Sequence, residues 1–136
     1  MKRTLAVLAL MFWAPLALAL SPYFYGNKLA AGEIQAVMAQ VESKLAQGGF
    51  NVVGKYAPPG LPGHGVVVVT EQGLLNAVRN LGGASIVGTP IRIGVKSDGT
   101  VSYENLEYWL RSYFRKQYPL AEKAVKAAHS KLAKAL

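Results

Sequence analysis

Hydrophobic residues recur along residues 34–45 with the period of an α-helix. They fall on one face of such a helix, at Ile34, Val37, Met38, Val41 and Leu45. Gly48 and Gly49 follow, and glycine readily adopts the left-handed conformation that ends helices. The pattern predicts an amphipathic helix that stops before Gly48.

Short segments elsewhere carry the patterns of β-strands. Residues 50–56 alternate between apolar and polar side chains, which predicts a half-buried strand. Residues 66–69 form a continuous valine run, typical of a strand covered on both faces. Residues 91–95 and 101–103 alternate on either side of Ser97-Asp98-Gly99-Thr100. Asp-Gly between two alternating segments predicts a β-hairpin.

Two further segments complete the first part of the pattern. Residues 21–29 contain Tyr23 and Tyr25 in alternation, so they form either a short edge strand or an extended arm. After residue 69, Thr70 is a suitable N-cap for a second helix, with Glu71 in its first turn. We expect this helix to bury Leu74, Leu75 and Val78 and to end near Gly82.

The stretch NLEYWLRSYFRKQYP, residues 105–119, combines aromatic and charged side chains. Asn105 is a suitable N-cap, and the following helix has one apolar face that we expect in the core: Leu106, Trp109, Leu110, Tyr113 and Phe114. Tyr108, Arg111 and Arg115 fall on the opposite side, where they either bind an anion or a flat ring or form a solvated charged face.

Pro119 begins a last helix, in which alanine, valine and leucine share one side and lysines occupy the other. Its apolar residues are small, so we expect docking against the domain or a second subunit, with only weak contact to a membrane surface. The element order predicts an α+β fold: a single antiparallel or mixed sheet of about four strands, with helices mainly on one face and two C-terminal helices.

The N-terminus has the three parts of a secretory signal peptide. Lys2 and Arg3 precede an apolar run that ends at Leu20, and Ala17-Leu18-Ala19 suits a signal peptidase. We expect cleavage after Ala19, with a retained membrane anchor as the alternative, although the run is shorter than the ~20 residues of a spanning helix. Residues 20–136 then form a single α+β domain, and the protein is periplasmic or secreted.

Export changes which partner the excess of basic residues indicates. Removing Lys2 and Arg3 from the 15 basic residues leaves 13 against 7 acidic ones. Outside the cytoplasm this surplus favours an anionic ligand, an envelope polymer or an acidic protein partner, and argues against nucleic acid. The chain has no cysteine, so it contains no disulfide or thiolate chemistry.

Residues for catalysis or metal binding are few. Asp98 is explained by the hairpin turn, and His64 and His129 are too few for a typical zinc site. We therefore expect no catalytic residues, no bound metal and no cofactor. His64 is considered separately because it lies in the loop of prolines and glycines at residues 57–65, and functional residues concentrate in loops.

The segments GGFNVVGKY, VVVVT and IRIGVKSDGTVSYENLEYW occur in this order within residues 31–113. In that order they resemble the bacterial family called domain of unknown function three-hundred-and-two. Leu106 stands where that family has proline. The resemblance implies an α+β domain that often dimerises and has no established activity, and it assigns no catalytic residues.

The leading hypothesis is an exported, non-catalytic binding or accessory protein of the cell envelope. Its expected binding residues are His64 in the loop and Tyr108, Arg111 and Arg115 on the basic edge of the C-terminal helices. One alternative is an enzyme or metal or ligand carrier centred on His64. Another is a structural subunit of a homodimer.

Overall fold

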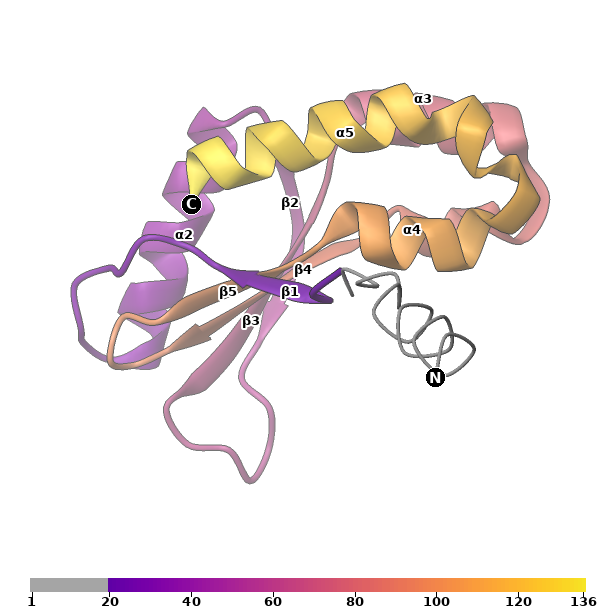
Figure 1. Ribbon diagram of the computed structural model, residues 1–136. Helices are drawn as coiled ribbons and strands as arrows, with labels where there is room; N and C mark the ends of the chain where they lie inside the picture. Colours follow the sequence, from indigo (N-terminus) through magenta and orange to yellow (C-terminus); the bar gives the residue numbers. More distant parts are fainter. Residues whose placement is uncertain (1–19) are drawn as a thin grey trace, which may run out of the picture.

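The computed structural model describes residues 20–136; the predicted signal peptide, residues 1–19, lies outside them. One antiparallel sheet runs through the molecule in the strand order β1-β5-β4-β3-β2 (Figure 1). The strands are β1 (Tyr23–Tyr25), β2 (Asn51–Tyr56), β3 (His64–Thr70), β4 (Ile91–Lys96) and β5 (Val101–Glu104).

Helices accompany the sheet, and the predicted α+β class is confirmed. They are α2 (Ile34–Gln47), α3 (Gln72–Leu81), α4 (Leu106–Phe114) and α5 (Tyr118–Ala135), with short 3-10 turns η1 (Gly83–Gly88) and η2 (Arg115–Gln117). Within residues 20–136, no helix is both long enough and apolar enough to cross a membrane. The two C-terminal helices, α4 and α5, are present as predicted.

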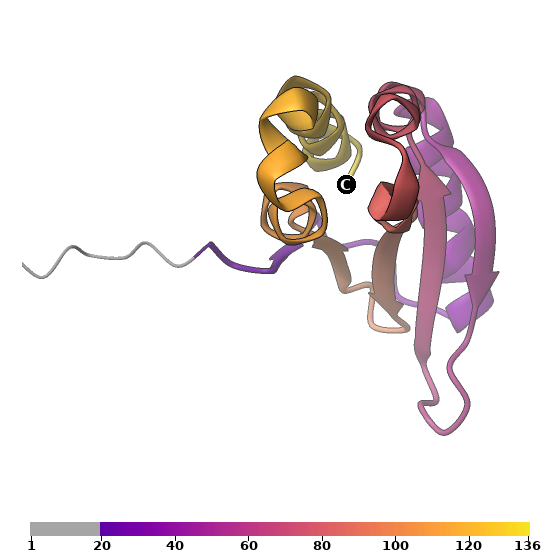
Figure 2. The same cartoon turned by 90° about the vertical axis from the view of Figure 1, so that its right-hand side faces the viewer.

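α2 packs on one face of the sheet, and α5, which lies on the same side, packs against α2, α3 and α4 (Figure 2). Gly65 of β3 lies against Met38 of α2, and the ring of Tyr103 of β5 lies 6.4 Å from that of His129 of α5. Val95 pairs with both Gly65 and Val101, so these contacts are on the same face. The core between the layers includes the expected residues of α2, of α5 and of the C-terminal Leu136 that follows it: Val37, Met38, Val41, Leu45, Ala121, Val125, Ala128, Leu132 and Leu136.

The sheet has one strand more than the four counted from the sequence. Residues 23–25 form β1, which pairs antiparallel with β5 through Tyr23↔Glu104 and Tyr25↔Ser102. The choice between edge strand and arm is thereby settled for this segment. Asn105 supports the strand, because its Nδ2 donates a 2.7 Å hydrogen bond to the Ser21 carbonyl.

Two predictions about strand burial were wrong. Val67 and Val69 of β3 are buried, but Val66 and Val68 are only partly covered, since no helix of residues 20–136 covers the second face. β2 is mostly exposed instead of half-buried, because it is an edge strand whose register shifts between Val52 and Gly54. A bulge of this kind interrupts the alternation that the sequence suggested.

The N-cap of α3 is Glu71, not Thr70. The Glu71 carboxylate accepts a 2.8 Å hydrogen bond from the Leu74 N–H and a second one from the Lys131 ammonium of α5. Burial alone would raise the pKa of Glu71, but these hydrogen bonds and the Lys131 charge outweigh it and lower the pKa. A single side chain therefore caps one helix and ties it to another.

The apolar face predicted for α4 is only partly in the core. Leu106, Leu110 and Phe114 are buried, and Gly88 of η1 lies against the last two. Trp109 is half-buried, and Tyr113 is 43 % exposed, so its placement in the core was wrong. The helix turns its 106-110-114 side toward its neighbours, which leaves the 109-113 side at the surface.

Candidate binding site on the open face of the sheet

One row of side chains crosses the open face of the sheet from edge to edge. The strand register places Tyr25 beside Ser102, Ser102 beside Gly94, Gly94 beside Val66, and Val66 beside Tyr56. Tyr25 is 81 % exposed and Tyr56 is 50 % exposed. A tyrosine therefore stands at each end of the row, with small side chains between them.

The small residues leave a hollow of about 260 Å³ in this face. Its floor includes Val66, Gly94 and Ser102, and Tyr25 bounds it on the β1 side. Pro58 and Leu61, from the loop between β2 and β3, form another wall. Because the lining is mostly apolar with a few polar groups at its edge, it has the character of a small ligand site.

His64 is one of those polar groups, and its position differs from the prediction. It is the first residue of β3, paired with Lys96, and not part of the preceding loop. Its Nδ1–H donates a 3.1 Å hydrogen bond to the Pro62 carbonyl. In the neutral ring this leaves Nε2 as an acceptor, and Nε2 can receive a hydrogen bond from a ligand.

No general acid–base pair forms around His64 in residues 20–136. Its one side-chain hydrogen bond goes to a backbone carbonyl, not to a carboxylate or a phenol. Within the same residues, no three histidine, aspartate or glutamate side chains are grouped as metal ligands. What His64 contributes to the hollow is thus a single polar contact at its edge.

A carboxylate lies farther along the same face. Glu104 pairs with Tyr23 across β1 and β5, and its carboxylate accepts a 3.2 Å hydrogen bond from the Arg92 N–H. The Arg92 guanidinium lies 3.5 Å from the other carboxylate oxygen. Burial raises the pKa of Glu104 even though Arg92 opposes the shift. This pair separates the hollow from the end of the sheet where α4 begins.

The structure does not bring His64 together with the predicted basic edge. His64 lies near the β4–β5 hairpin, whereas Tyr108, Arg111 and Arg115 belong to the helix region after the opposite end of β5 (Figure 1). The four predicted binding residues therefore form two separate groups, and only His64 reaches the hollow.

Arg111 is already engaged by its neighbours. Its guanidinium lies 3.6 Å from the carboxylates of both Glu107 and Glu122 and 4.3 Å from the centre of the Tyr118 ring. It therefore bridges α4 and α5. Arg115 is exposed, and Tyr108 packs its ring edge to face with Trp109 at 5.2 Å.

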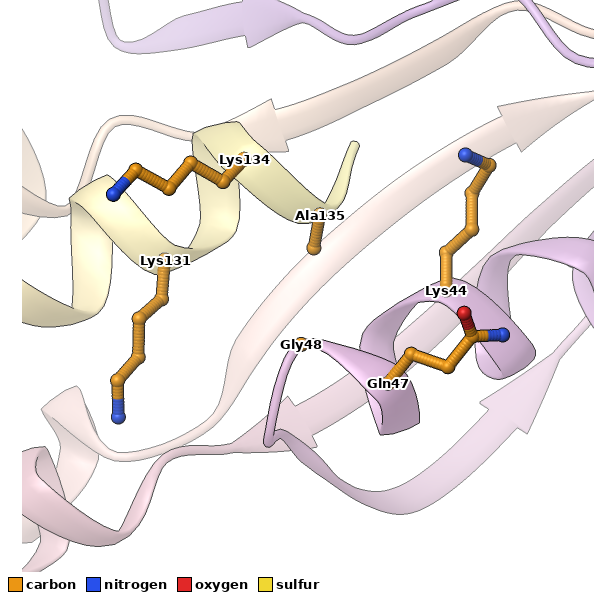
Figure 3. A pocket seen from close by; sticks show the side chains of 6 residues that line it. All are labelled: Lys44, Gln47, Gly48, Lys131, Lys134 and Ala135. Atoms are coloured by element: carbon orange, nitrogen blue, oxygen red, sulfur yellow. The ribbon is translucent and has the colours of Figure 1, made fainter.

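A second hollow, of about 390 Å³, lies where the C-terminal ends of α2 and α5 meet, and it contains three lysines. In Figure 3 the ammonium groups of Lys44, Lys131 and Lys134 point in different directions, so they do not converge on one anion. Lys44 and Lys134 occupy the last turns of their helices, where positive charge complements the helix dipole. Lys131 binds Glu71. These roles explain the lysines without a ligand.

The chain matches no protein-family model and no curated protein sequence. The resemblance to the domain-of-unknown-function family stays a prediction.

Most residues of the hollow were not singled out from the sequence. Tyr25, Gly94 and Ser102 lie on three different strands, and only the strand pairing brings them together. Gly94 and Ser102 alternate with the buried residues of their own strands, such as Ile93 and Tyr103. This alternation was the signal in the sequence that could have identified them, because residues between the buried positions of a strand face away from the helices.

Proposed function

We infer that the protein is an exported, non-catalytic binding module of the cell envelope, and that its ligand occupies the hollow on the open face of the sheet. The observation that carries this proposal is the row in which Tyr25 and Tyr56 flank Ser102, Gly94 and Val66. The small side chains in the middle of this row leave the space, which Tyr25 bounds on the β1 side and Pro58 and Leu61 bound on another.

The chemistry of the hollow favours a ligand with an apolar face and polar groups at its rim. The Tyr25 ring and Leu61 offer apolar contact, while the Ser102 hydroxyl and the His64 ring offer hydrogen bonds. Lys96 adds a positive charge at the edge. A sugar unit of an anionic envelope polymer combines these properties.

Two features support a binding role over a catalytic one. The His64 ring is hydrogen-bonded to a backbone carbonyl, and no carboxylate or phenol of residues 20–136 is hydrogen-bonded to it. Glu104 is held by Arg92 through its backbone and its side chain. Both groups serve better as fixed polar contacts than as a proton-transfer pair.

Filling the hollow tests the proposal. Gly94→Val places methyl groups beside Ser102, whose hydroxyl can rotate away. Gly54→Val is the matched control, because Gly54 lies on the same face in open space outside the hollow. Binding of the purified full chain to isolated cell-wall polymer is measured by co-sedimentation, with circular dichroism and thermal unfolding as the checks on folding.

We expect Gly94→Val to weaken binding by about tenfold or more, as blocking a contact worth ~1.4 kcal/mol does. Gly54→Val should bind like the wild type. Equal binding by a folded Gly94→Val protein would show that the hollow is not the ligand site.

A further inference from the structure

Four aromatic side chains from distant parts of the chain form a surface cluster, here called the aromatic patch: Tyr23, Tyr108, Trp109 and Tyr113. The Trp109 ring is the centre, at 5.8 Å from Tyr23, 5.2 Å from Tyr108 and 6.2 Å from Tyr113. Tyr23 is 52 % exposed and Tyr108 is 37 % exposed. The patch is separate from the hollow and takes no part in the function proposed above.

The composition of the patch suits the boundary between a membrane and water. Tyrosine and tryptophan combine a large apolar ring with a polar tip, and they concentrate where a membrane meets water. The Trp109 Nε1–H donates to the Pro22 carbonyl, so its polar group is satisfied while the ring remains half-buried. An apolar ring with a satisfied donor enters a lipid interface at little cost.

Positive charge lies next to the patch. Arg115 and Lys116 begin the 3-10 turn η2 that follows α4, two and three residues after Tyr113, and both are exposed. In residues 20–136, neither forms an ion pair. The nearby Glu107 is paired with Arg111. The local surplus is therefore positive, which complements anionic lipid headgroups.

The path of the chain near Leu20 gives an independent reason to expect the patch close to a membrane. Asn105 and Trp109 bind the carbonyls of Ser21 and Pro22, so Leu20, the first residue that the structure describes, lies beside the patch. In the sequence, Leu20 is the last residue of the apolar run. Any copy that keeps this run in a bilayer has its aromatic patch within a few residues of the membrane surface.

We propose that the aromatic patch docks the domain on the lipid–water interface of an anionic membrane, before or without removal of the N-terminal segment. Tyr23, Tyr108, Trp109 and Tyr113 insert among the headgroups, and Arg115 and Lys116 bind lipid phosphates. Docking turns one end of the molecule toward the bilayer and leaves the loop with Leu61, at the other end of the sheet, accessible to a ligand (Figure 1).

Trp109 fluorescence tests the proposal directly. The chain has two tryptophans, so Trp13→Phe makes Trp109 the only one. The full-length Trp13→Phe protein is reconstituted into phosphatidylglycerol–phosphatidylcholine vesicles whose acyl chains carry bromine near the headgroup. Bromine quenches tryptophan only at short range, so the emission reports whether Trp109 reaches the interface.

We expect emission to fall by about twofold for a ring at interfacial depth. The double variant Tyr108→Gln/Tyr113→Gln should lose most of this quenching, and Tyr56→Gln, an exposed tyrosine outside the patch, should not. For Arg115→Gln/Lys116→Gln we expect the quenching to weaken in anionic vesicles and to stay unchanged in neutral ones, since each cation adds roughly fivefold to the attraction.

The proposal fails if the protein floats with the vesicles while Trp109 remains unquenched. That outcome is the one expected if the patch binds another protein or faces water. It also fails if Tyr56→Gln and the double variant reduce the quenching equally. Because the changed tyrosines are exposed, near-ultraviolet circular dichroism should show an intact fold in each variant.

Discussion

The indole Nε1–H of Trp109 donates a 3.0 Å hydrogen bond to the carbonyl of Pro22, which lies 87 residues earlier in the chain. Asn105 makes a parallel contact, since its Nδ2 binds the Ser21 carbonyl and its backbone N–H binds the Pro22 carbonyl at 2.9 Å. β1 has only three residues, so these contacts from the start of α4 fix its position at the edge of the sheet.

Replacing Trp109 by phenylalanine should loosen β1 specifically. The variant keeps an aromatic ring beside Tyr23 but loses the hydrogen bond to Pro22, which costs about 1 kcal/mol of the free energy of unfolding. Urea denaturation measures the loss, and hydrogen exchange at Tyr25 and Gly26 locates it. Tyr113→Phe is the control, and it should change the free energy by less than about 0.5 kcal/mol. Unchanged exchange in Trp109→Phe would contradict the role of this contact.

The amphipathic helices were predictable because their periodicity extends over several turns. Val37, Met38, Val41 and Leu45 of α2 are all buried, as expected. The short strands were harder, since burial there depends on which face the helices cover and on the position of each strand in the sheet. Val66 and Val68 look like core residues in the sequence and are only partly covered in the structure.

The candidate site was largely hidden because it depends on contacts between distant segments. Gly94 becomes the floor of a hollow only when Ser102 and Val66 pair on either side of it. Arg111 looked available for an anion, but the packing of α5 against α4 brings Glu122 and Tyr118 to it. No local pattern in residues 105–119 contains that information.

Gly99 should tolerate no side chain. It has a φ of +87° in the β4–β5 hairpin, and a Cβ there would collide with the backbone of Leu29, whose N–H binds the Gly99 carbonyl at 2.9 Å. Gly99→Ala should lower the free energy of unfolding by about 2 kcal/mol or more. Gly32→Ala places its methyl in open space and should change it by less than about 0.5 kcal/mol. Similar values for both variants, measured by urea denaturation, would refute this explanation.

Arg115 presents the opposite case, a side chain where glycine fits better. It ends α4 with φ 49° and ψ −120°, a conformation that non-glycine residues rarely adopt. Arg115→Gly should therefore raise the free energy of unfolding by about 1 kcal/mol. Arg115→Gln removes the same charge but keeps the strain, so its thermal midpoint should stay at the wild-type value. An equal gain in both variants would assign the effect to charge instead.

His129 should make the protein less stable in mild acid. Its ring lies 5.4 Å from that of Phe24 and 6.4 Å from that of Tyr103, and its buried Nδ1 has no hydrogen-bond partner among residues 20–136. Burial lowers the pKa of His129 below 6.5, although the charge of Glu107 opposes the shift. The unfolded chain thus takes up a proton at a higher pH than the folded one.

The sign of the pH effect follows from this difference. Where the unfolded state binds more protons, stability falls as the pH falls, so the loss begins near pH 6.5 and continues down to the folded-state pKa. The slope should be only a part of the ~1.4 kcal/mol per pH unit that one proton can give, because solvent screens a partly exposed ring. Thermal unfolding of the wild type between pH 8 and pH 5.5 measures this slope.

His129→Phe should flatten the dependence of stability on pH in this range, whereas His64→Gln, which leaves His129 in place, should retain it. If His129→Phe keeps the wild-type slope, another group is responsible for the acid sensitivity.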